Sequence, residues 1–135
     1  EIGTGSGYQA AVLVEMGMKV FSIERQKDLF DFSKSILLKL GYNITQKFGD
    51  GYKGIPSYAP FDGIIVTAAS PDIPSDLVEQ LSPKGSLVIP IGYPENDQVM
   101  KRIMKSNTVE GYEEEDLGSF RFVPMLKDIE SGDSF

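Results

Sequence analysis

The sequence predicts an α/β fold with a mostly parallel, twisted sheet, helices on both faces and antiparallel strands near the C-terminus. Short apolar runs of strand length alternate with amphipathic helical stretches, which is typical of a parallel sheet covered by helices. A glycine-rich loop at residues 3–7 leads directly into the first helical stretch. Beyond Gly92 the helical stretches fade and two strand-like runs follow one another. Those runs favour antiparallel pairing at that end of the sheet.

Three helices are expected. Residues 8–16 contain strong helix formers, and Gly17 is placed to end that helix. A short helix is expected over residues 74–81. The helix over residues 28–40 carries apolar side chains at helical spacing, and Gly41 is its stop. Amphipathic spacing of this kind normally marks the buried side of a helix, so we expect core packing for its apolar stripe, Leu29, Phe32, Ile36, Leu37 and Leu40.

Six strands are expected, over residues 19–23, 43–48, 60–67, 86–91, 98–106 and 119–126. The Pro-Lys-Gly sequence at residues 83–85 predicts a turn, and Pro90 should lie near a strand end or a sheet edge because proline cannot donate to a ladder. Residues 111–116 include four consecutive acidic side chains that repel one another. We expect a solvated loop there.

The composition limits the chemistry that the chain can perform. Its 135 residues, 41% of them hydrophobic, suit a single domain. The chain has no Cys and no His, which excludes Cys/His metal sites, disulfides, a thiol nucleophile and a histidine base. The formal net charge of −7 argues against nucleic acid or an anionic membrane surface as a partner. No apolar run has the length of a membrane helix, and we expect a cytoplasmic protein without a metal.

The strongest functional signal is the loop that contains Gly3 and Gly5. Its spacing is G-x-G-x-G, with an acid, Glu1, two residues before the first glycine. Glycines allow a ligand to approach a helix N-terminus closely. A dinucleotide fingerprint places its third glycine one residue later, so this spacing favours a ligand without a diphosphate. The alternative is a tight strand-to-helix turn that binds nothing.

Two acidic residues follow predicted strands. Glu24 directly follows the strand expected over residues 19–23, at a position where a nucleotide-binding sheet places a carboxylate that accepts hydrogen bonds from both ribose hydroxyls. Asp50 lies between Gly49 and Gly51, and it could accept from an adenine amino group while the glycines leave room for the ring. The alternatives are a surface acid at Glu24 and an ordinary turn aspartate at Asp50.

Separated segments in the same order resemble the protein-L-isoaspartate O-methyltransferase family, whose members are class I S-adenosylmethionine-dependent methyltransferases with a Rossmann-like fold. The segments are residues 1–9 (EIGTGSGYQ), 21–25 (FSIER), 49–51 (GDG), 60–69 (PFDGIIVTAA), 81–92 (LSPKGSLVIPIG) and 121–125 (RFVPM). Residues 1–135 then form a methyltransferase domain that lacks its N-terminal segment, since the family carries a Q-x-I-S-x-P segment before the glycine loop. Two further departures are Ser70, where the family usually has Ala, and Lys84, where Gly is common.

The resemblance implies transfer of a methyl group from S-adenosylmethionine to the free α-carboxyl of L-isoaspartyl residues in damaged proteins, which starts their repair through a succinimide. A main-chain-like carboxyl has a pKa near 3.5. It is therefore ionised at neutral pH and needs no general base, so the absence of His is no objection. The enzyme class would be protein-L-isoaspartate (D-aspartate) O-methyltransferase. No catalytic residue is assigned, because the acceptor-side serine belongs to the expected missing segment.

The resemblance also implies the binding residues. The cofactor S-adenosyl-L-methionine would be bound by Glu1, Gly3, Gly5, Glu24, Arg25, Asp50, Gly51 and Thr67. The isoaspartyl substrate would be bound by Ala68, Ala69, Val123 and Pro124. The expected partners are isoaspartyl-containing proteins or peptides, without nucleic acid or membrane, and the expected state is a monomer or weak oligomer. The alternatives are a methyltransferase with another acceptor and an inactive cofactor-binding fragment; glycine spacing disfavours a nicotinamide dehydrogenase.

Overall fold

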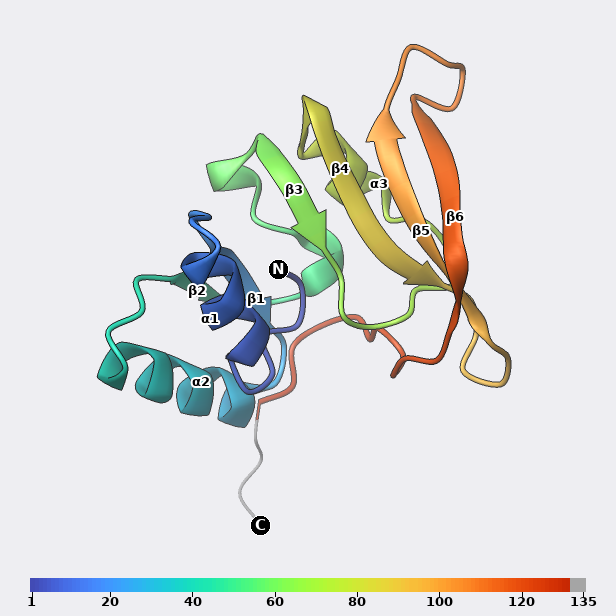
Figure 1. Ribbon diagram of the computed structural model, residues 1–135. Helices are drawn as coiled ribbons and strands as arrows, with labels where there is room; N and C mark the ends of the chain where they lie inside the picture. Colours follow the sequence, from blue (N-terminus) through green and yellow to red (C-terminus); the bar gives the residue numbers. More distant parts are fainter. Residues whose placement is uncertain (132–135) are drawn as a thin grey trace. The chain divides into compact units, whose positions relative to one another are not determined.

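The computed structural model describes residues 1–131, which belong to two compact units (Figure 1). The first unit comprises residues 1–51 and the segment from Lys127 onward; the second comprises residues 52–126. The elements are α1 (Tyr8–Glu15), β1 (Phe21–Glu24), α2 (Lys27–Lys39), β2 (Thr45–Phe48), β3 (Phe61–Ile65), α3 (Ser75–Glu79), β4 (Leu81–Ile91), β5 (Gln98–Lys105) and β6 (Tyr112–Phe120), with two short 3₁₀ helices at Gly51–Lys53 and Pro56–Tyr58. None of the helices in residues 1–131 is long and apolar enough to cross a membrane.

Parallel pairing organises the first unit. β1 and β2 pair in parallel, from Phe21 with Thr45 to Glu24 with Phe48. The chain before the glycine loop joins this arrangement, because Ile2 forms a parallel bridge with Ile23. Parallel strands bring their carboxyl ends to one edge. The glycine loop, Glu24 and the loop after β2 therefore meet at that edge.

Helix α1 begins at a glycine that no other residue could replace without strain. Gly7, the N-cap, has φ 86°, a conformation that residues with a Cβ rarely adopt. A Cβ added there would lie only 3.0 Å from Cδ1 of Leu37 in α2. The glycine thus serves both the turn into α1 and the close approach of α2.

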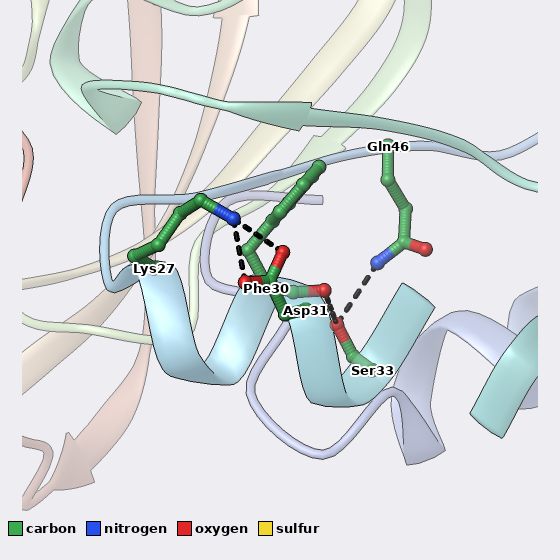
Figure 2. Close-up of polar contacts among 5 residues, drawn as sticks. All are labelled: Lys27, Phe30, Asp31, Ser33 and Gln46. Carbon is green, nitrogen blue, oxygen red and sulfur yellow. Dashed lines mark hydrogen bonds and ion pairs between the residues drawn. The ribbon is translucent and has the colours of Figure 1, made fainter. Parts of the chain in front are cut away.

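Helix α2 contradicts the predicted core stripe. Only Leu37 of that stripe is buried, whereas Leu29, Phe32, Ile36 and Leu40 are 36–64% exposed. The side of α2 that faces β2 instead carries residues 30, 33 and 37. The Phe30 and Phe48 rings lie 5.8 Å apart, and the amide of Gln46 donates to the Ser33 hydroxyl at 2.9 Å (Figure 2). The helix has apolar residues on two sides, so periodicity alone selected the wrong one.

The second unit contains a four-stranded sheet in the order β3-β4-β5-β6. β3 and β4 pair in parallel, and the β4–β5 and β5–β6 pairs are antiparallel. The predicted α/β class and the antiparallel strands near the C-terminus are therefore confirmed. The core of this unit includes the fully buried side chains of Leu77, Leu87, Ile89 and Ile103. Pro90 lies next to the last residue of β4, as expected.

The turn predicted at residues 83–85 is wrong, because β4 is continuous from Leu81 to Ile91. Its early part lies against β3: Phe61 pairs with Leu81, and the register shifts between Phe61 and Gly63. A Cβ added at Gly85 would lie 2.7 Å from the Phe61 carbonyl oxygen. Gly85 therefore permits close strand approach rather than a reversal of the chain.

The loop predicted at residues 111–116 is also wrong, because β6 runs from Tyr112 to Phe120. Basic residues of β5 offset the acidic run. Lys101 bonds to Glu114 at 2.6 Å and to Asp116 at 3.0 Å, and Arg102 pairs with Glu115 at 2.5 Å. The strand predicted at 119–126 is correspondingly displaced, since β6 ends at Phe120.

Candidate functional site

Backbone hydrogen bonds to β1 shape the glycine loop. The N–H of Ile23 donates to the Glu1 carbonyl at 3.0 Å, and the N–H of Gly3 donates to the Ile23 carbonyl at 2.9 Å. The loop then turns through positive φ values at Gly3 (92°) and Gly5 (55°). A Cβ added at Gly5 would meet nothing within 4 Å, so the backbone at Gly5 is open to a ligand.

Glu24 joins the end of β1 to this loop. The whole residue is only 5% exposed. One carboxylate oxygen accepts the Gly5 N–H at 2.9 Å, and the other accepts the Gln26 N–H at 3.0 Å. The structure therefore brings together two of the predicted cofactor residues, Gly5 and Glu24. Two backbone donors hold the carboxylate in place, as suits a group that accepts from ligand hydroxyls at a strand end.

A second buried network lies beside Glu24. The Ser22 hydroxyl, which is fully buried, lies 2.6 Å from a carboxylate oxygen of Glu1 and 2.6 Å from the hydroxyl of Thr4. The Gln9 amide donates to the other Glu1 oxygen at 2.9 Å. Glu1 was predicted as a site residue, but Ser22, Thr4 and Gln9 were missed. The available signal was a serine inside the strand sequence FSIE.

Asp50 and Arg25 both contact the C-terminal segment, which lies along the end of β1. One Asp50 oxygen accepts the Asp128 N–H at 3.2 Å. The Arg25 guanidinium donates to the Asp128 carbonyl at 3.0 Å and pairs with the Glu130 carboxylate at 2.9 Å. Glu130 also forms a parallel bridge with Gln26. Gly51, which follows Asp50, is buried. The sequence offered no local signal for this contact between residues about 100 positions apart.

The predicted substrate residues lie in the second unit, and three of them come together. The N–H of Ala69 donates to the Val123 carbonyl at 2.7 Å, and the N–H of Met125 donates to the Ala69 carbonyl at 2.7 Å. Ala69 thus forms a parallel bridge with Pro124. Ala69 is 2% exposed, whereas Val123 is 69% exposed. The result is a fixed backbone that presents the Val123 side chain to solvent.

Thr67 and Ala68, which precede Ala69, are half-buried residues of the second unit. Thr67 was expected to contact the cofactor and Ala68 the substrate. Both assignments stay predictions, as do those of Arg25 and Asp50.

Polar side chains reinforce the Val123 segment, and sequence reasoning missed them. The Tyr52 hydroxyl donates to the Met125 carbonyl at 3.2 Å and lies 3.3 Å from the Ser70 hydroxyl. The fully buried Ser70 donates to the Asp72 carbonyl at 2.6 Å. Upstream, the side-chain oxygen of buried Gln98 accepts the Phe122 N–H at 2.6 Å.

The chemistry available to these residues is binding and orientation. The first unit offers fixed carboxylates and an open glycine backbone at one sheet edge, and the second offers a rigid backbone segment. Within residues 1–131, no group of three or more His, Cys, Asp or Glu residues is placed to hold a metal ion. Such an arrangement suits a polar ligand with hydroxyl or amine donors, provided that any activated group arrives with the ligand.

Comparison with known proteins gives a consistent result. The family model described as Protein-L-isoaspartate(D-aspartate) O-methyltransferase (PCMT) matches residues 1–130. A curated relative named protein-L-isoaspartate O-methyltransferase, from Christiangramia forsetii, is 53% identical over 129 residues, which are 95% of this chain and 59% of the relative. The relative of that name from Salinibacter ruber is 48% identical over 141 residues, covering 98% of this chain and 61% of the relative. The chain thus spans about three fifths of the length of these relatives.

Solved structures described by the same family name are also similar to this chain. A protein-L-isoaspartate O-methyltransferase structure is similar with a TM-score of 0.85 and 27% identity, covering 95% of this chain and 41% of that one. A second structure is described as a putative protein-L-isoaspartate O-methyltransferase from Plasmodium falciparum in complex with S-adenosyl-L-homocysteine. Its TM-score is 0.73 at 29% identity, covering 94% of this chain and 64% of that one.

Proposed function

Because the chain belongs to the protein-L-isoaspartate O-methyltransferase family, we propose that it acts in methyl transfer from S-adenosylmethionine to the free α-carboxyl of L-isoaspartyl residues in damaged proteins. The resulting ester would collapse to a succinimide and open partly to normal aspartate. The observation that carries the proposal is the junction between Glu24 and Gly5, where a buried carboxylate is fixed at 2.9 Å from the loop backbone.

The residues of the first unit fit S-adenosylmethionine. Gly5 leaves open space beside its Cα, which a ligand without a diphosphate can approach. In this proposal Gly3 and Gly5 border the amino-acid end and Glu24 accepts from the ribose hydroxyls. Asp50 with Gly51 borders the adenine. When bound, the cofactor supplies the activated methyl group. The homologue structure with S-adenosyl-L-homocysteine supports this ligand class.

The second unit would hold the acceptor. Ala69 fixes the Val123 carbonyl at 2.7 Å, and the adjoining Pro124 is exposed. The segment is therefore rigid and accessible, as a surface that orients a peptide must be. The acceptor carboxyl is ionised at neutral pH, so these residues need only align it, and alignment alone is worth several kcal/mol. In this proposal Thr67 is a cofactor-binding residue, and Ala68 and Ala69 are substrate-binding residues.

The proposal extends to partners and location. Isoaspartyl-containing proteins or peptides are the proposed substrates. The net charge of −7 supports a role without nucleic acid or an anionic membrane surface. We expect a cytoplasmic monomer or weak oligomer.

A paired-peptide assay tests the function. The chain is incubated with S-adenosylmethionine labelled in its methyl group and with two peptides that differ only in having isoaspartyl or normal aspartyl linkage. The expected result is base-labile methyl ester on the isoaspartyl peptide alone, with heat-inactivated chain as the blank. Equal labelling of both peptides would favour another acceptor. Binding of S-adenosylhomocysteine in calorimetry without any labelling would contradict the transferase role and favour a cofactor-binding fragment.

A further inference from the structure

A buried hydroxyl pair supports the glycine loop. Ser22 is 0% exposed and Thr4 is 4% exposed, and their hydroxyl oxygens lie 2.6 Å apart. Ser22 lies in β1, whereas Thr4 lies between the two loop glycines Gly3 and Gly5. The pair therefore joins the first part of the loop to the neighbouring strand.

The direction of the hydrogen bonds follows from chemistry. A carboxylate only accepts, so the Ser22 hydroxyl must donate its single proton to Glu1 at 2.6 Å. The contact between Ser22 and Thr4 then requires Thr4 to donate to Ser22. The order is Thr4 to Ser22 to Glu1. Because Ser22 both accepts and donates, its removal would leave two partners without their bond.

Ser22 and Glu24 divide the loop between them. Strand side chains alternate, so these residues, two positions apart in β1, lie on the same side of the strand. Glu24 binds the Gly5 N–H, while Ser22 binds the Thr4 side chain and the Glu1 carboxylate. Glu24 is the proposed ribose acceptor. Ser22 instead holds the residues that begin the loop, on the proposed amino-acid side of the cofactor.

On the basis of the proposed function, we propose that Ser22 is a positioning residue for the amino-acid end of the cofactor. Ser22 acts without touching the cofactor, because it holds the Glu1 carboxylate and the Thr4 side chain of the loop in place. The juxtaposition of a buried strand hydroxyl, a loop hydroxyl and a carboxylate carries this inference. A purely structural serine would support binding of every part of the cofactor equally.

The chain offers a matched control in Ser33. This serine is also 0% exposed and lies in the same unit, with bonds to Gln46 at 2.9 Å and to the Phe30 carbonyl at 3.2 Å (Figure 2). It joins α2 to β2, and within residues 1–131 neither of these hydrogen bonds goes to the glycine loop. Ser33→Ala therefore removes a buried hydroxyl of similar stabilising value from the same unit.

The experiment compares two ligands by calorimetry: S-adenosylhomocysteine, which has the amino-acid end, and adenosine, which lacks it. In Ser22→Ala we expect the Kd of S-adenosylhomocysteine to rise about 10-fold, because two buried hydrogen bonds are lost, while the Kd of adenosine changes less than about twofold. Ser33→Ala should alter neither Kd by more than about twofold. Ser22→Thr, which keeps the hydroxyl, should restore most of the affinity for S-adenosylhomocysteine.

Thr4→Val provides a second variant that keeps the Ser22–Glu1 bond, and we expect about a threefold loss for S-adenosylhomocysteine alone. The inference is overturned if the Ser22 and Thr4 variants weaken both ligands equally, if they weaken neither, or if Ser33→Ala has the same effect as Ser22→Ala. If the unaltered chain binds neither ligand, the proposed function itself fails, which distinguishes the two outcomes.

Discussion

The two units hold their predicted binding segments in different ways. In the first unit, buried side chains hold the glycine loop: Glu24 binds the Gly5 N–H, and Ser22 binds Thr4 and Glu1. In the second unit, the Val123 segment is held mainly by backbone pairing with Ala69, at 2.7 Å in both directions. We therefore expect side-chain identity to matter more in the first unit, and the second unit to tolerate side-chain changes that keep the pairing.

Glu24→Ala is the substitution with the largest expected effect on this comparison. It removes both charge-assisted bonds to the backbone and the proposed ribose acceptor. Binding of S-adenosylhomocysteine should weaken by about 1–3 kcal/mol, roughly 5- to 150-fold in Kd, measured by calorimetry. Glu15→Ala is the control, since Glu15 is an exposed residue of the same unit. An unchanged Kd would show that Glu24 does not belong to the binding site. It would also contradict the view that buried side chains hold the binding loop of the first unit.

Tyr52→Phe tests the second unit and should have a smaller effect. It removes the hydroxyl that donates to the Met125 carbonyl but leaves the Ala69 pairing intact. We expect the free energy of unfolding to fall by about 0.5–1.5 kcal/mol, measured in urea, with the KM for isoaspartyl peptide nearly unchanged. Tyr93→Phe is the control, because Tyr93 is 58% exposed. A large rise in KM would show that the side chain, rather than the backbone, holds this segment.

Lys101→Met should have the smallest effect. Lys101 bonds to Glu114 and Asp116 on β6, and the bond to Glu114 is the main cause of its raised pKa. Partly exposed pairs are worth about 0.2–1 kcal/mol. We therefore expect the free energy of unfolding to fall by that amount at neutral pH and low salt. Because the pKa is raised, the contribution of the Lys101 ammonium group is present at neutral pH and is lost as the pH rises through the folded-state pKa.

The control for Lys101 is Lys84→Met, at an exposed residue of β4. The loss in the Lys101 variant should shrink as salt screens the pairs. A loss that does not respond to salt would indicate that packing, rather than charge, joins β5 to β6.

Much of the fold could be predicted because local signals agreed with it. Helix α1 lies between the glycine loop and Gly17, as these glycines predicted, and the apolar run at residues 60–67 contains β3. The errors have a common cause. The prediction judged the acidic residues of β6 alone, although Lys101 and Arg102 of β5 lie opposite them in the sheet. The apolar stripe of α2 failed similarly, since sequence periodicity does not show which side meets β2.

The site divides in the same way. Gly5 and Glu24 were predictable because both follow from the geometry of a parallel sheet, and Ala69 and Val123 followed from a resemblance between short segments. Ser22 and Tyr52 could not be predicted, since a single hydroxyl in the sequence does not indicate a role until its hydrogen-bond partners are known. The contact of Arg25 with Asp128 and Glu130 depends on the return of a distant segment, which no local pattern encodes.

The acidic run of β6 also affects how the edge of the sheet can pair with other molecules. β6 is the last strand in the order β3-β4-β5-β6, and an outer strand offers unpaired backbone groups that can recruit a strand from another molecule. Glu113, Glu115 and their acidic neighbours line that strand and are largely exposed. Two copies brought edge to edge would set these like charges against each other. We therefore expect the residues that misled the loop prediction to disfavour edge-to-edge pairing of this sheet.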